Sequence, residues 1–166
     1  MQLGDQLNLL PLKSENDYIY WIKFGNNLRV ENETEISINV FSKILDSLNK
    51  EIELKTSTIS KLTGMTLYAL ALSYEKKINP LNQLKSIGEF FPNNIFFLNK
   101  ITNNQPSSIN LIEETFNIYD SILTNVSEND FPAQAHFRIG ELKYLITNDF
   151  DGAINSYKLA SKNKTF

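Results

Sequence analysis

Residue types that commonly perform chemistry are sparse in this sequence. The chain contains no cysteine and a single histidine, His136. Thiolate nucleophiles, disulfides, cysteine metal sites and paired-histidine metal sites are therefore excluded for this chain. The remaining candidates are two acidic pairs, Glu113 with Glu114 and Asp149 with Asp151, because two carboxylates can act together as general acid and general base.

Neither acidic pair has the arrangement that acid–base catalysis needs. Glu113 and Glu114 are neighbours in a predicted helix, so they point in different directions and we expect a solvated surface. Asp149 and Asp151 flank a predicted helix start, where negative charge interacts favourably with the helix dipole, so we expect a capping role. Their spacing is not that of a calcium-binding loop. We therefore expect a protein that is not an enzyme, with no metal and no cofactor.

The other polar residues add no candidate for catalysis or nucleic-acid binding. We expect His136 to pack against its neighbours or to lie at a rim. The glycines stand alone in the sequence, so no glycine-rich phosphate loop is present. The formal net charge is −3, and Arg29 and Arg138 are the only arginines. Because nucleic-acid binders carry a basic stripe or domain, we expect no nucleic-acid partner.

No segment of the sequence has the length and hydrophobicity of a membrane span. The longest apolar run, residues 65–72, is far shorter than the roughly 20 residues that a spanning helix needs. The first residues have neither a basic start nor a long apolar segment, so we expect no secretory signal. These features favour a cytoplasmic location.

Apolar residues recur at helical steps along most of the chain. The clearest example is 59–78, where Ile59, Leu62, Leu70 and Tyr74 share one stripe. Further helices are predicted over 35–50, 80–91, 107–123, 132–146 and 153–162, while 93–103 could be helix or strand. Short breaks containing Asn, Asp, Pro or Gly separate them. The pattern predicts an all-α protein.

Residues 18–30 fit two interpretations at first sight. The aromatic-rich stretch 18–24 and the stretch 28–30, on either side of Gly25-Asn26-Asn27, are compatible with the two strands of a β-hairpin. Trp21, Phe24, Gly25 and Leu28 also recur at steps of three and four, as on one face of a helix.

A comparison with later residues favours the helix. Trp21-x-x-Phe24-Gly25-x-x-Leu28 is followed by Ser37, Phe41 and Ile44. This spacing resembles the tetratricopeptide repeat, whose pattern is W-x-x-L-G-x-x-Y and then A-x-x-x-F. Partial matches recur at Leu67, Leu70, Ala71 and Tyr74, at Thr115, Tyr119 and Ile122, and at Ile139, Gly140, Ala153, Tyr157 and Ala160.

The resemblance implies an α-solenoid of antiparallel helix pairs wound into a right-handed superhelix. About four pairs are expected, at about 17–50, 58–92, 93–125 and 131–162, after an N-terminal extension over 1–16. The small residues would let paired helices approach closely, so Gly25 is predicted to be a contact point between helices.

Proteins of this family typically bind peptides or partner proteins on the concave face made by the first helices. By the resemblance, the inward residues are Ile22, Asn26, Arg29, Tyr68, Leu72, Glu75, Phe137, Glu141 and Tyr144. One subclass clamps a C-terminal carboxylate with Lys and Asn, but Ile22 stands where that clamp has Lys. The expected ligand is instead a partly apolar peptide or helix.

Two functions follow from this architecture. The first is a non-catalytic adaptor or scaffold that binds a protein partner on the concave face. The alternative is a structural subunit, the N-terminal piece of a larger assembly. The sequence ends just after a second helix without a polar capping helix, so the last pair is expected to continue or to self-associate.

Overall fold

A computed structural model describes residues 11–78, 107–126 and 130–162, with side chains omitted for 107–110. The described part contains helices and no strand, so the all-α prediction is confirmed there. The helices are α2 (Glu15–Val30), α3 (Thr34–Asn49), α4 (Thr56–Ile78), α7 (Ser107–Asn125), α8 (Phe131–Leu145) and α9 (Phe150–Ser161). The elements predicted over 80–91 and 93–103 lie outside the described residues.

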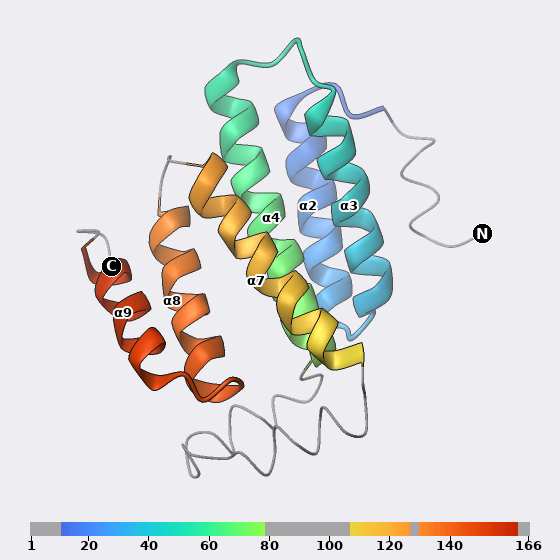
Figure 1. Cartoon of the computed structure of the whole chain (residues 1–166). Coiled ribbons are helices and arrows are strands. Elements are labelled where there is room, and N and C mark those ends of the chain that lie inside the picture. The colour runs from blue at the N-terminus through green and yellow to red at the C-terminus, as the bar shows by residue number, and fades with distance from the viewer. Residues whose placement is uncertain (1–10, 79–106, 127–129, 163–166) are drawn as a thin grey trace.

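The six described helices lie side by side, and each runs opposite to the described helix before it (Figure 1). Each packs against the next described helix along the chain. In addition, α4 contacts α2 on one side and α8 on the other. This central position of α4 makes it the element through which distant parts of the chain meet.

Residues 18–30 form helix and not a hairpin. The Ser14 hydroxyl accepts the Asp17 N–H at 3.2 Å, and the Asp17 carboxylate accepts the Ser14 N–H at 3.0 Å. This reciprocal capping box starts α2 at Glu15, slightly before the predicted boundary at residue 17. No glycine in the described part has a positive φ, so Gly25 is a helical residue and not a turn former.

Two glycines, which have no side chain, allow neighbouring helices to lie in close contact. A Cβ on Gly25 would lie 2.7 Å from the Phe41 ring of α3, and one on Gly140 would lie 2.8 Å from the Tyr157 ring of α9. Both distances are too short for real atoms, so only glycine permits these helix separations. The prediction that Gly25 is a helix contact point is confirmed.

The hydrophobic core extends from α2 to α8. Its largest fully buried side chains include Tyr18, Phe41, Ile44, Tyr119 and Ile122. Small polar residues also lie inside it, and the Ser37 hydroxyl of α3 donates to the Ser73 hydroxyl of α4 at 3.0 Å. α4 and α7, which the sequence analysis placed in the second and third predicted pairs, pack directly against each other.

Candidate functional site

The acidic pairs lie where the sequence analysis expected them. Glu113 and Glu114 are exposed on α7. Asp149 caps α9, since its Oδ1 accepts the Gly152 N–H at 3.0 Å, and Asp151 is exposed in the first turn. The two predictions, a solvated surface and a capping role, are confirmed.

The described residues offer no other conventional reactive centre. Half-buried His136 has a pKa below its ordinary value because burial disfavours the charged ring. Within residues 11–78, 107–126 and 130–162, no three His, Asp or Glu side chains gather as metal ligands. Over the same residues, no helix has the length and apolar character to cross a membrane.

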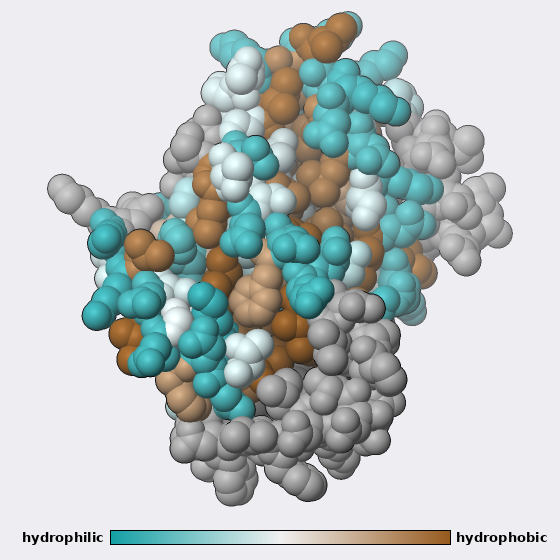
Figure 2. All heavy atoms as spheres, viewed as in Figure 1, coloured by the Kyte–Doolittle hydropathy of each residue, from teal (hydrophilic) through white to brown (hydrophobic). Residues whose placement is uncertain are grey.

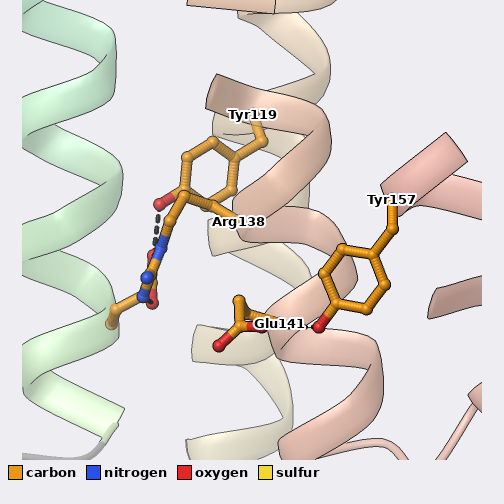
Figure 3. Close-up of polar contacts among 5 residues, drawn as sticks. Tyr119, Arg138, Glu141 and Tyr157 are labelled. Carbon is orange, nitrogen blue, oxygen red and sulfur yellow. Dashed lines mark hydrogen bonds and ion pairs between the residues drawn. The ribbon is translucent and has the colours of Figure 1, made fainter. Parts of the chain in front are cut away.

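Glu75, in the last turns of α4, is the centre of a polar cluster made by three helices. Arg138 of α8 forms an ion pair with it, donating from Nη2 to Oε1 and from Nε to Oε2, the latter at 3.2 Å. The Tyr119 hydroxyl of α7 also donates to Oε2. Tyr119 and Arg138 thus approach the same carboxylate from different helices (Figure 3).

Burial makes these contacts stronger than those of a surface ion pair. The side chains of Glu75 and Arg138 are only 13% and 26% exposed, and Tyr119 is fully buried. Burial, reinforced by the Glu75 charge, raises the pKa of Tyr119 well above that of a free phenol. Burial opposes the charge of Arg138, but the hydrogen bonds and charge of Glu75 outweigh it and raise the Arg138 pKa.

Arg29 of α2 lies beside this cluster. Its guanidinium interacts electrostatically with Tyr119, Tyr68 and Glu75, and burial lowers its pKa. Its Nη2 donates to Asn26 Oδ1 at 3.1 Å, while its Nε is buried without a hydrogen-bond partner. Both arginines of the sequence therefore converge near one carboxylate.

A second set of contacts joins α8 to α9. The Tyr157 hydroxyl donates to Glu141 Oε1 at 2.5 Å (Figure 3). The rings of Phe137 and Tyr157 lie 5.8 Å apart, and those of Tyr144 and Phe150 lie 5.4 Å apart. These contacts join Phe137, Glu141 and Tyr144 of α8 to Tyr157 and Phe150 of α9.

Eight of the nine residues assigned to the inward face are half-buried, namely Asn26, Arg29, Tyr68, Leu72, Glu75, Phe137, Glu141 and Tyr144. We call these eight residues of α2, α4 and α8 the first-helix face. Ile22 is different, because it is only 2% exposed and belongs to the core. Its predicted position on a partner-binding surface is therefore corrected, since a buried side chain cannot contact a partner there.

The structure brings some of these residues together and adds others. Arg29, Tyr68 and Glu75 lie around one cluster, whereas Phe137, Glu141 and Tyr144 belong to the α8–α9 contacts. The sequence analysis missed Arg138 and the polar roles of Tyr119 and Tyr157. Both tyrosines were part of the repeat pattern, and the rarity of arginine was the only signal that pointed to Arg138.

The surface of the protein is mixed in character. Figure 2 shows apolar side chains interleaved with polar ones over the face in view. The large apolar side chains that are most exposed in the described part are scattered over several elements: Tyr20, Val30, Ile52, Ile154 and Leu159.

Comparison of the chain with protein-family models, with curated proteins and with solved structures finds no match.

Proposed function

We propose that this chain is a non-catalytic adaptor that binds a peptide or helix of a partner protein on the first-helix face. The observation that carries the proposal is the cluster at Glu75, where side chains of α2, α4, α7 and α8 meet. The cluster fixes half-exposed groups of three first helices relative to one another. Such a preorganised surface reduces the entropy that binding would otherwise cost.

We further propose that the helices form a solenoid similar to tetratricopeptide repeats, with α2/α3, α4/α7 and α8/α9 as its pairs. Support comes from equivalent positions in the pairs. A small residue of the first helix, Gly25 or Gly140, meets an aromatic ring of the second, Phe41 or Tyr157. In the middle pair, buried Ala71 and Tyr119 occupy the corresponding positions. In this proposal, residues 79–106 come between the two helices of one pair.

The composition of the face indicates the kind of ligand. Tyr68, Leu72, Phe137 and Tyr144 offer partly exposed apolar surface, and Arg29 and Glu141 offer charge. Aromatic and arginine side chains commonly dominate the binding energy of protein interfaces. A short segment with alternating apolar and polar groups would match this mixture.

Leu72 provides the most direct test. It is half-buried on the face but does not pack against the main core cluster, so Leu72→Asp should leave the fold intact. We expect affinity capture with the whole chain to recover partners that Leu72→Asp no longer recovers. Ile52→Asp is the matched control, because Ile52 is 89% exposed in the loop between α3 and α4.

The result depends on a comparison of the three proteins. Circular dichroism should first show equal helix content in both variants and the wild type. Partners that are lost with Leu72→Asp and kept with Ile52→Asp support the first-helix face. Equal recovery by all three proteins would contradict the proposal.

A second candidate function is structural, through self-association of the last pair. Ile154 of α9 is 51% exposed. Ile38 of α3 and Phe116 of α7, at the equivalent positions in the proposed pairs, are partly buried against the core. In the proposed solenoid, α9 therefore presents an apolar residue at a position where the other second helices are covered.

Light scattering distinguishes this candidate from the adaptor. We expect the wild-type mass to rise with concentration, and Ile154→Glu to keep the mass of a monomer. Leu159→Glu is the control, because Leu159 is 43% exposed on the opposite flank of α9. A monomeric wild type at all concentrations would eliminate self-association and leave the adaptor proposal intact.

A further inference from the structure

The charges gathered around Glu75 do not balance. Arg138 and Tyr119 together occupy both oxygens of the Glu75 carboxylate. Arg29 approaches the same group, yet its hydrogen bond among the described residues goes to the neutral amide of Asn26. One of the two positive charges therefore has no hydrogen-bonded counter-charge in the described part of the chain.

The setting of Arg29 increases its attraction for an anion. The side chain is half-buried, and its Nε is buried without a hydrogen-bond partner. An unpaired buried N–H is unfavourable, because it has lost its bonds to water and gained none. A charge at a partly desolvated position is also screened less than one in open water.

The neighbours of Arg29 indicate an anionic group carried by a peptide. Tyr68 lies close enough to interact electrostatically with Arg29, and its ring is part of the first-helix face. A planar guanidinium matches the geometry of a carboxylate. The net charge of −3 for the whole chain opposes a long polyanion, whereas a single carboxylate needs only one cation without a hydrogen-bonded counter-charge.

We propose that Arg29 binds the carboxylate of an aspartate or glutamate side chain within the partner segment that lies on the first-helix face. This inference rests on the proposed function and names the chemistry of its ligand. Asn26 orients the guanidinium by accepting from Nη2. Arg138 remains engaged with Glu75 and does not contact the ligand.

The test uses a displayed library of random short peptides, selected on the whole wild-type chain. Selected peptides are resynthesised with each acidic residue replaced by its amide. Both forms are measured against the wild type, Arg29→Gln, Arg29→Lys and Lys23→Gln. Lys23 is exposed on the same helix, so Lys23→Gln makes the same change in net charge away from the cluster.

We expect one acidic residue in each selected peptide whose amide form binds the wild type about tenfold more weakly, as the loss of a charge-assisted contact predicts. Against Arg29→Gln the acid and amide forms should bind alike. Against Lys23→Gln the difference in affinity between the acid and amide peptides should remain. Against Arg29→Lys part of that difference should be present. Equal thermal unfolding of the four proteins checks that the variants fold.

Other outcomes separate this inference from the function on which it rests. Leu72→Asp is measured as a fifth protein. Peptides that bind the wild type independently of any acidic residue, but do not bind Leu72→Asp, would overturn the role of Arg29 and keep the adaptor. A preference for phosphoserine over the acidic residue would overturn the carboxylate assignment. A library that yields no binder would contradict both proposals.

Discussion

Gly25 and Gly140 set the separation of two helix pairs, although neither carries a side chain. In each case the space that a Cβ would fill is occupied by an aromatic ring, of Phe41 or of Tyr157. Phe41 is fully buried, and Tyr157 is tethered to Glu141. Because neither ring is free to move aside, an added methyl group must push the helices apart.

Gly25→Ala should therefore destabilise the protein, against the usual preference of helices for alanine. We expect the free energy of unfolding to fall by about 1–3 kcal/mol, as overpacked cores do. Denaturant unfolding measures the change. The control is Asn27→Ala at an exposed position of the same helix. A Gly25→Ala variant that gained stability would show that α2 and α3 can separate at little cost.

At the scale of elements, polar contacts add to apolar packing in positioning α8 and α9. α9 packs on α8, and α8 meets α7 and α4. The ion pair between Glu75 and Arg138 crosses the α4–α8 junction. The first-helix face thus depends on this junction for its shape.

Glu75→Gln should weaken the α4–α8 junction. The substitution leaves Arg138 partly buried without its counter-charge. We therefore expect the free energy of unfolding to fall by about 2 kcal/mol, which is less than the loss for fully buried pairs. Hydrogen exchange should become faster in α8 and α9 and change little in α2 and α3. Glu35→Gln removes one partner of the more exposed Glu35–Lys77 pair and should cost less than about 1 kcal/mol.

A double-mutant cycle of Glu75→Gln with Arg138→Gln isolates the interaction itself. The decreases in the free energy of unfolding caused by the two single substitutions should add up to more than the decrease in the double variant, because each substitution removes the same contact. Strict additivity would show that the pair does not couple α4 to α8.

At the scale of the whole molecule, burial shifts most of the tyrosines in one direction. The pKa values of Tyr18, Tyr68, Tyr74, Tyr119 and Tyr157 all lie above the ordinary value of 10.0, with burial as the largest cause. The folded protein therefore keeps phenol protons that the unfolded chain releases. This contribution to stability is complete below the unfolded pKa and is lost as the pH rises through the folded values.

We accordingly expect the free energy of unfolding to decline as the pH rises above about 10. Denaturant unfolding over a series of alkaline pH values measures the decline. Tyr119→Phe should make it less steep, because Tyr119 is fully buried beside Glu75. Tyr20→Phe, at a side chain that is 64% exposed, is the control. An identical slope in both variants would contradict the expectation.

Much of the helical architecture could be predicted from local patterns. The helical periodicity of apolar residues and the small residues predicted α2, α4 and α8 close to their observed bounds. The spacing of Gly25 and Phe41 also predicted a contact that the structure contains. The sequence predicted less well whether a residue lies on the buried or the exposed face of its helix. Ile22 was assigned to the binding face but is buried, because the exposed arc of a helix depends on how its neighbours are rotated against it.

The sequence by itself determined the helices of the described part, their close contacts at small residues, and the absence of cysteine chemistry and of paired-histidine metal sites. These properties depend on residue type and on spacing within a few turns. Only the tertiary structure decided that α4 packs on α7, and that Arg29, Glu75, Tyr119 and Arg138 form one cluster. Those residues come from four helices, and Glu75 is 44 residues from Tyr119 and 63 residues from Arg138. The packing of the helices brings these side chains together, and the periodicity of the sequence does not show which of them will meet.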